Sequence, residues 1–570
     1  MRTYRAHLLA AASVILMLAS LPAAATPSGD RLIAAAQDGL MAELDALIAK
    51  HTYVNATDSA GATALAWAVM RGKDEVAARL LKAHADPNRT DANGVSPLLL
   101  AVDSNALGLV KLLLANGANA SLARDDGETP LMHAVQAGSL DMVQMLLAGK
   151  ADVNAREKQF GQTALMWAAG HPELTTLLLS HGADFRAATK SWETSTVNYV
   201  NVTSTLGATG IPWNNEGSYS GKAGGSTPML FAIQAGDLKS VEALIAAGAD
   251  INQAAADGTT PLLASLYNFS TGAGMGAGRN ASRGLRYAPS PAIANLLLDR
   301  GAQINVSDRA GYTPLHGAVL VLVAGGTGRL PQIGFQPTKL STPDAPAPVA
   351  PKNEAEGLKL VARLLDLHAD PNAETKNTTP GPVGALRVNP ASTGSTPFHL
   401  AAFAHSTKLI DLMAAHRANP NLVRKDGHTP FSLAVMSNDL PVVKAMVAHG
   451  ADLKMIYNPV DKVAGTDPLK ADAYPRGNET ILHIAAIPGA NYVVEYLAQQ
   501  GVPLDAKNSL GQTALQLADE QEQFRFMHDK EGPHGIGLEG ANKGKVIVRE
   551  TQTTDAFKRA MGLKTHVATN

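Results

Sequence analysis

Apolar residues along the chain recur with the spacing of two short amphipathic helices followed by a polar turn. In one clear unit, a helical run ends at Ala137, just before Gly138, and a second helical run covers residues 141–147. The second run of an earlier unit has the apolar stripe Val76, Ala77, Leu80 and Leu81. Positions i, i+1, i+4 and i+5 lie on one face of a helix, so each unit is predicted to be a helix–turn–helix.

A threonine or serine precedes the first helix of each unit and reveals the period of the pattern. These residues are Thr63, Ser96, Thr129, Thr163, Thr227, Thr260, Thr313, Thr396, Thr429, Thr480 and Thr513. Successive gaps are 33, 33, 34, 64, 33, 53, 83, 33, 51 and 33 residues, so a long gap is one unit plus an insertion. Counting back one period from Thr63 reaches a degenerate first unit at Asp30, which gives about twelve units in total.

The unit resembles the ankyrin repeat, which combines a turn, T-P-L-H-x-A, a helix, a glycine, a second helix and G-A-D-x-N. The fullest matches are Thr313-Pro314-Leu315-His316, Thr396-Pro397-Phe398-His399 and Gly248-Ala249-Asp250-Ile251-Asn252. The resemblance covers residues 28–525 with interruptions. It implies an all-α ankyrin-repeat solenoid of helix–turn–helix units with finger turns, several inserted loops and a C-terminal capping segment.

Departures from the period divide the chain. Repeats one to five are expected at 28–189 and repeats six to twelve at 224–525, with an insertion at 190–223 that includes a small strand at 196–205. Repeat five is short around Gly170, so its turn between helices is expected to be distorted. Further insertions are expected at 268–290, 322–356, 376–392 and 455–476.

The C-terminal segment, residues 526–570, is expected to cap the last repeat, because a terminal repeat needs a polar or covered outer face. A strand is expected at 545–549, followed by a short helix with Phe557 and Met561 on one face.

The N-terminus has the features of a secretory signal peptide over residues 1–25. Arg2 and Arg5 precede an apolar stretch at 8–21, and three alanines that end at Ala25 offer a cleavage site. The apolar stretch is short for a bilayer span, although an uncleaved anchor helix is the alternative. The protein is therefore expected to be periplasmic or secreted, with no membrane span after cleavage.

Composition restricts the chemistry. The formal net charge is −2, from 48 Lys and Arg against 50 Asp and Glu, without the basic excess of a nucleic-acid-binding protein. Cysteine is absent, which excludes disulfides and thiolate metal sites. No zinc motif of the H-E-x-x-H type and no nucleophile–base arrangement follow from the spacing, so no catalytic residue, cofactor or metal is predicted.

Several histidines and tryptophans stand out, each with a structural explanation. The resemblance implies that the motif histidine hydrogen-bonds backbone groups, and this histidine occurs at His316, His399 and His483. His133 is one residue out of register and carries less weight. Trp67 and Trp167 lie four residues after the capping hydroxyl, where half-buried helix packing is favoured over binding.

Partner-binding candidates are the first-helix residues that should face the concave groove of the solenoid. They are Met70, Arg71, Asp103, Gln136, Gln234, Phe403 and Met436. In repeat eight the equivalent pair, Leu320 and Val321, belongs to an apolar run that is either a contact site or covered by its own inserted arm.

A glycine-rich stretch at 272–279 superficially resembles a phosphate loop. It lies between two helices of one repeat and lacks the Gly-Lys-Ser/Thr ending, so a flexible insertion is the favoured interpretation. Arginines on this loop and on the equivalent loop of the next repeat suggest a basic surface for an acidic partner or ligand. They are Arg279, Arg283, Arg286 and Arg329.

The predicted function is an exported, non-catalytic scaffold that binds a protein partner through the concave ankyrin groove and the inserted loops. Two alternatives remain open: an accessory subunit that docks on an exported enzyme or redox complex, and a secreted effector. An enzyme built from the insertions and the tail would require titratable side chains to meet in a pocket between 190–223 and 322–356.

Overall fold

The structure, a computed structural model, describes residues 28–194, 221–266, 289–323, 354–376, 393–458, 477–486, 490–519 and 552–563. The signal peptide, the strands expected at 196–205 and 545–549, and the glycine-rich stretch lie outside these residues. The chain forms two compact units, Met1–Ala187 and Ala188–Asn570, called unit 1 and unit 2 below.

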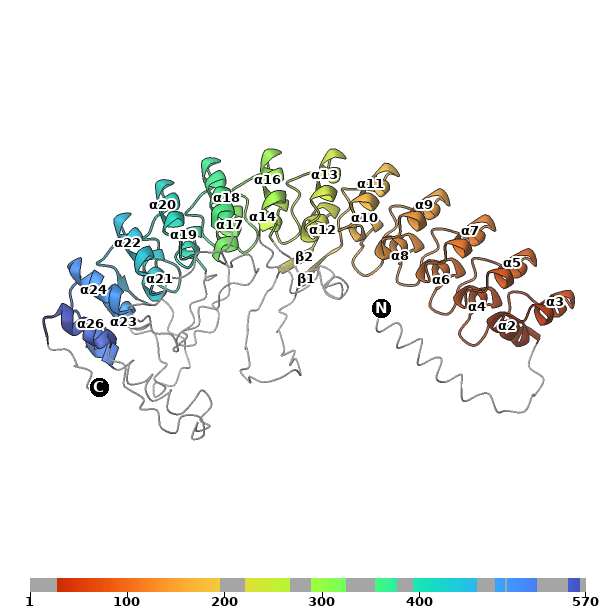
Figure 1. Cartoon of the computed structure of the whole chain (residues 1–570), viewed down its shortest axis with the longest axis horizontal. Helices are drawn as coiled ribbons and strands as arrows, with labels where there is room; N and C mark the ends of the chain where they lie inside the picture. The colour runs from red at the N-terminus through yellow and green to blue at the C-terminus, as the bar shows by residue number, and fades with distance from the viewer. Residues whose placement is uncertain are drawn as a thin grey trace, which may run out of the picture. The chain divides into compact units, whose positions relative to one another are not determined.

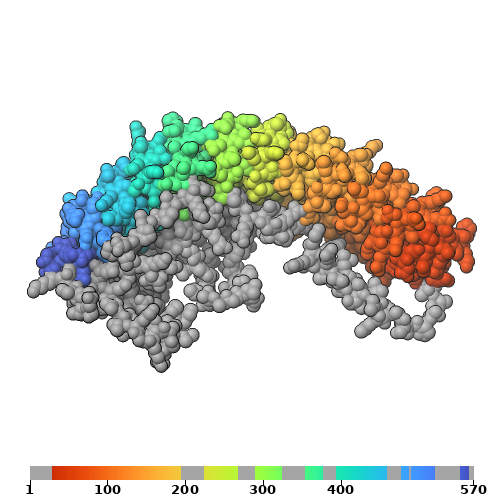
Figure 2. Space-filling model, in the orientation of Figure 1, coloured from red at the N-terminus to blue at the C-terminus, as the bar shows by residue number. Residues whose placement is uncertain are grey.

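Unit 1 is a stack of helix pairs in sequence order (Figure 1). The pairs are α2 (Ser28–Asp38) with α3 (Met41–Ala49), α4 (Ala64–Met70) with α5 (Asp74–Lys82), α6 (Pro97–Asp103) with α7 (Leu107–Ala115), α8 (Pro130–Ala137) with α9 (Leu140–Ala148), and α10 (Ala164–Trp167) with α11 (Pro172–Ser180). First helices contact first helices, and from α5 onward second helices contact second helices. In the space-filling view the unit is a continuous surface that passes from red to orange (Figure 2).

Unit 2 repeats the arrangement. Its pairs are α12 (Pro228–Gln234) with α13 (Leu238–Ala246), α14 (Pro261–Leu266) with α16 (Pro291–Asp299), α17 (Pro314–Val323) with α18 (Glu354–Asp366), α19 (Pro397–Ala401) with α20 (Thr407–Ala415), α21 (Pro430–Met436) with α22 (Leu440–Ala448), and α23 (Ile481–Ala486) with α24 (Asn491–Gln499). A further first helix covers 514–519. The all-α solenoid expected from the sequence is confirmed.

Helix α26 (Gln552–Ala560) covers α24 at the C-terminal end of unit 2. Phe557 is completely buried, and Arg559 forms an ion pair with Glu495. Met561 lies beyond the end of α26 and is 41% exposed, so only one residue of the expected apolar pair is buried.

Two short antiparallel ribbons form in the inserted fingers of unit 2. Strand β1 (Ser191–Thr194) pairs with β2 (Gly221–Gly224), and β3 (Ile456–Tyr457) pairs with β4 (Glu479–Thr480). In repeat eight, α17 and α18 extend into the range expected to be the 322–356 insertion, because its apolar run continues the helix. Leu320 and Val321 are buried on α17 and therefore do not form an exposed contact site.

The helix boundaries follow from local chemistry. In repeat four, the Thr129 hydroxyl accepts a hydrogen bond from the Met132 N–H at 3.3 Å, and Pro130 begins the helix. Gly138 ends the helix with φ 72°, a conformation that glycine adopts without a Cβ clash. In repeat five, α10 is only four residues long, as expected from the shortened turn around Gly170. Among the described helices, none combines the length and apolarity needed to cross a bilayer.

An asparagine ladder connects successive repeats. The Asn88 side chain accepts from the Asn119 N–H at 2.6 Å and donates to the Gly117 carbonyl at 3.0 Å. Equivalent asparagines accept a backbone N–H from the next repeat: Asn55, Asn154, Asn252, Asn305, Asn372 and Asn421. At the two positions that precede a β-ribbon, the ladder residue is instead Arg186 or Lys454.

Candidate functional site

The first helices of unit 1 carry one row of partly exposed side chains, called the first-helix row below. Its members lie four residues after the threonine or serine that precedes each first helix: Trp67, Leu100, His133 and Trp167. The residues on either side of each member are buried, as Ala66 and Ala68 are. Because α4, α6, α8 and α10 contact one another in order, the row crosses repeats two to five.

Both tryptophans of the row are fixed by their indole N–H groups. Trp67 Nε1 donates to Asp58 Oδ2 at 2.8 Å, and Trp167 Nε1 donates to Gln162 Oε1 at 2.7 Å. The Arg71 guanidinium lies 5.9 Å from the centroid of the Trp67 ring. The expected half-buried packing of these rings is confirmed, and their remaining surface is held rigidly at the first-helix face.

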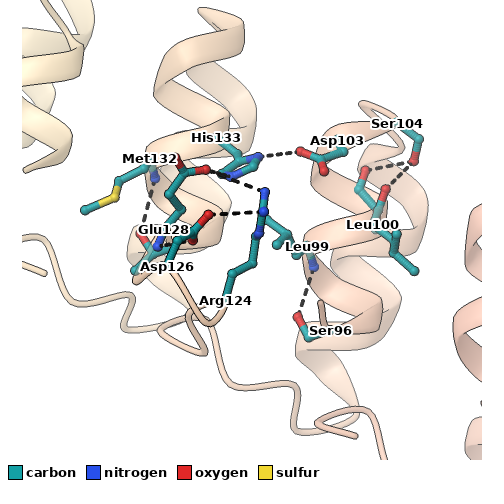
Figure 3. Close-up of polar contacts among 12 residues, drawn as sticks. Ser96, Leu99, Leu100, Asp103, Ser104, Arg124, Asp126, Glu128, Met132 and His133 are labelled. Carbon is teal, nitrogen blue, oxygen red and sulfur yellow. Dashed lines mark hydrogen bonds and ion pairs between the residues drawn. The ribbon is translucent and has the colours of Figure 1, made fainter. Parts of the chain in front are cut away.

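His133 lies between two carboxylates in the middle of the row (Figure 3). Its Nδ1 is 2.6 Å from Asp103 Oδ1, and its Nε2 is 3.0 Å from Glu128 Oε2. Arg124 completes the cluster, with Nη1 3.7 Å from Glu128 Oε2 and Nη2 3.1 Å from Asp126 Oδ2. Asp103 ends α6, whereas the other four residues belong to repeat four, so this charged cluster joins two repeats.

The cluster keeps His133 protonated at neutral pH. Burial disfavours a charged imidazole, but hydrogen bonds and negative charges from Asp103 and Glu128 outweigh it and raise the pKa of His133 to about 9. Both ring nitrogens then donate to carboxylates, so the ring is unsuited to accept a proton as a general base. Among the described residues, no group of His, Asp and Glu side chains is arranged to hold a metal ion.

Sequence reasoning misses most of this cluster. Of its members only Asp103 is among the predicted partner-binding residues, and His133 carries little weight in the sequence because it is one residue out of the motif register. That offset is what places it on the first-helix face rather than in the core. The useful signal is geometric. Stacking places His133, four residues after Thr129, beside Asp103, seven residues after Ser96 of the preceding repeat.

The structure distributes the other predicted partner-binding residues unevenly. Met70 is 38% exposed and Arg71 is exposed, whereas Gln136, Gln234 and Met436 are half-buried near the ends of their helices. The prediction that Phe403 faces the groove is wrong. Its side chain is only 3% exposed, because α19 ends at Ala401 and Phe403 belongs to the following turn. The predicted arginines lie outside the described residues: Arg279, Arg283, Arg286 and Arg329.

The motif histidines have the structural role that the resemblance implied. His399 Nδ1 accepts from the Thr396 N–H at 3.0 Å, and its Nε2 donates to the His428 carbonyl of the next repeat at 3.3 Å. His316 and His483 make the same pair of contacts. Burial lowers the pKa of His316 to about 4 and, with the Arg424 charge, that of His399 to about 3, so both rings are neutral.

A second ionic cluster, not predicted from the sequence, lies around a buried arginine in repeat ten. The Arg424 side chain is completely buried and forms a two-pronged ion pair with Asp426. The His428 ring stacks on Tyr457 with centroids 4.4 Å apart. The finger sequence Arg-x-Asp-Gly occurs in both clusters and was the available signal.

Comparison with known proteins agrees with the architecture. A model of three ankyrin repeats matches residues 32–124, 98–189 and 353–456, and a single-repeat model matches 224–256. The chain belongs to the ankyrin-repeat family. Comparison with curated proteins gives no match. Ankyrin repeats are generic protein–protein interaction modules.

Proposed function

We propose that this ankyrin-repeat protein is an exported, non-catalytic scaffold that binds a protein partner through the first-helix row of unit 1. The observation that supports this most strongly is the unbroken row of partly exposed side chains from Trp67 to Trp167. Tryptophan is enriched among residues that dominate interface energies. Because both indoles are already fixed by hydrogen bonds, binding orders few additional side-chain torsions.

Binding, rather than catalysis, suits the charges of this face. The only histidine of the row is protonated and engaged on both sides, and the family is generally non-catalytic. Export rests on residues 1–25 of the sequence. N-terminal sequencing of the protein recovered from the periplasm or the medium should begin at Thr26, and an intact N-terminus in the cytoplasm would refute export.

The chain contains no cysteine, so a single introduced thiol is a unique attachment point for a photo-crosslinker. We expect Met70→Cys, on the first-helix face, to crosslink a discrete protein in an extract of the source cells. The matched control is Gln144→Cys, on the exposed side of α9. Equal crosslinking at both positions, or at Gln144→Cys alone, would show that another surface binds.

A further inference from the structure

The charged side chains of the cluster around His133 differ in how deeply they are buried. Glu128, the deepest carboxylate, is 5% exposed and contacts both cations, His133 and Arg124. Asp103 and Asp126 each contact one cation, and their side chains are 32% and 40% exposed. Asp103 and Asp126 therefore form the solvent side of the cluster. Each exposed carboxylate can accept further hydrogen bonds.

Apolar surface flanks these two carboxylates along the first-helix row. Leu100 is half-buried one repeat before His133, and Met70 is 38% exposed beside Trp67. With helices packed about 10 Å apart, the row from Trp67 to Trp167 spans roughly 30 Å. An extended chain covers that distance with about nine residues. A short peptide segment can therefore contact the whole row.

We propose, building on the proposed function, that the partner of unit 1 presents an extended segment with a lysine or arginine side chain against Asp103 and Asp126. The aliphatic stem of such a side chain packs on Leu100 while its charged head reaches Asp103, one turn farther along α6. Apolar side chains on either side of the basic residue contact the tryptophans. An acidic side chain at this place would face two carboxylates whose cations are already paired, which is electrostatically unfavourable.

Repeat ten shows why the inference is confined to unit 1. It has the same finger pair, Arg424 and Asp426, but the Arg424 side chain is completely buried and the chain's own Tyr457 stacks beside it on His428. Phe403 and Leu433 stand at the positions of Asp103 and His133, and both are buried. The exposed carboxylate of Asp103 and the half-buried ring of His133 therefore have no counterpart in repeat ten.

The test uses the whole purified chain as bait for a phage library that displays random 12-residue peptides. The wild type is compared with the double variant Asp103→Asn/Asp126→Asn. The matched control is Asp141→Asn, an exposed carboxylate in the first turn of α9. We expect peptides enriched in Lys or Arg from the wild type and the control. The best peptide, measured by fluorescence anisotropy, should bind the double variant about five- to tenfold more weakly.

Other outcomes overturn the inference. These are peptides without a basic residue, basic peptides that bind the double variant equally well, or no enriched peptide at all. Far-UV circular dichroism checks that the double variant is folded. If it is not, Asp126→Asn alone and the charge-conserving Asp103→Glu carry the test: the first should weaken binding and the second should retain it.

The proposed function is tested separately in the same assay with Trp67→Ala. If selected peptides lack a basic residue but lose affinity for this variant, the first-helix row is the binding surface and only the partner chemistry is wrong. If peptides bind Trp67→Ala and the double variant as well as they bind the wild type, the row itself is not the binding surface.

Discussion

Replacing His399 with glutamine separates the structural and the titrating roles of a motif histidine. Repeat twelve already carries Gln516 at this position, and its Oε1 accepts from the Thr513 N–H at 2.9 Å. The variant His399→Gln should therefore keep the acceptor that holds the helix start. It loses the titratable ring, including the Nε2–H group that donates to the His428 carbonyl.

The sign and size of the pH effect follow from burial. The pKa of His399 is about 3 in the folded protein against its ordinary value of 6.5, so the unfolded chain takes up a proton first as pH falls. Stability from the neutral ring is complete above pH 6.5 and is lost as pH falls from 6.5 towards 3. At pH 5, 1.5 units below the unfolded pKa, the loss is about 2 kcal/mol.

The order of stability of the variant and the wild type should therefore reverse between pH 7.5 and pH 5. At pH 7.5 His399→Gln should be less stable by about 1 kcal/mol, the typical net value of the lost hydrogen bond. At pH 5 it should be more stable by about 1 kcal/mol, because only the wild type has lost about 2 kcal/mol.

Local hydrogen exchange of α19 and α20 measures the difference, because repeat arrays open locally rather than in one global step. Comparing the two proteins at the same pH cancels most of the intrinsic exchange rate. The control is His181→Gln, which removes an exposed histidine from unit 1 and should leave α19 and α20 unchanged. If wild type and His399→Gln differ by the same amount at pH 7.5 and pH 5, the reasoning is wrong.

Three further predictions concern other parts of the chain. Because the pKa of His133 is raised to about 9, the stability that its charged ring contributes is complete below pH 6.5 and is lost as pH rises through 9. Hydrogen exchange of α8 should therefore show a loss of about 2.5 kcal/mol from pH 7 to pH 10. Gly117→Ala should lower the free energy of unfolding in urea by about 1 kcal/mol, because Gly117 has φ 84° and a Cβ there would meet open space. Gly127→Ala should lower it by more, because its Cβ would lie 3.0 Å from the backbone nitrogen of Lys158. Phe557→Ala should cost about 3 to 5 kcal/mol and make α26 sensitive to limited proteolysis, whereas an unchanged cleavage pattern would contradict its role as a cover.

Much of the fold was predictable because each repeat carries its own boundary chemistry. Thr129 and Gly138 mark the start and end of a helix by local hydrogen bonding and backbone conformation, which depend little on distant residues. The role of His399 came from the resemblance to the ankyrin repeat, and its Nδ1 contact lies only three residues away. Stacking then repeats the arrangement along the chain.

The candidate site was less predictable because its contacts cross between repeats. Asp103 and His133 are 30 residues apart, and only the stacking of α6 on α8 brings their side chains together. Phe403 failed as a groove residue because its helix ends early, which the repeat period does not reveal. Period and local motifs therefore predict the solenoid, whereas the surface depends on side chains at particular neighbouring positions.

At the junction between repeats ten and eleven, both residues of one asparagine-ladder contact are replaced. At regular junctions an asparagine side chain accepts a backbone N–H of the next repeat, as Asn421 accepts from Asp452 at 2.8 Å. Here Lys454 replaces the asparagine and Pro503 stands where the donor would be, so both the acceptor and the N–H are lost together. If only the asparagine were replaced, the backbone N–H of the next repeat would lose its usual acceptor. Because proline has no N–H, replacing both residues leaves no such donor without an acceptor. The ribbon β3–β4 forms in the finger that follows Lys454, where Ile456 pairs with Thr480. The departure at Lys454 and Pro503 is therefore paired, and the amino-acid sequence alone reveals it.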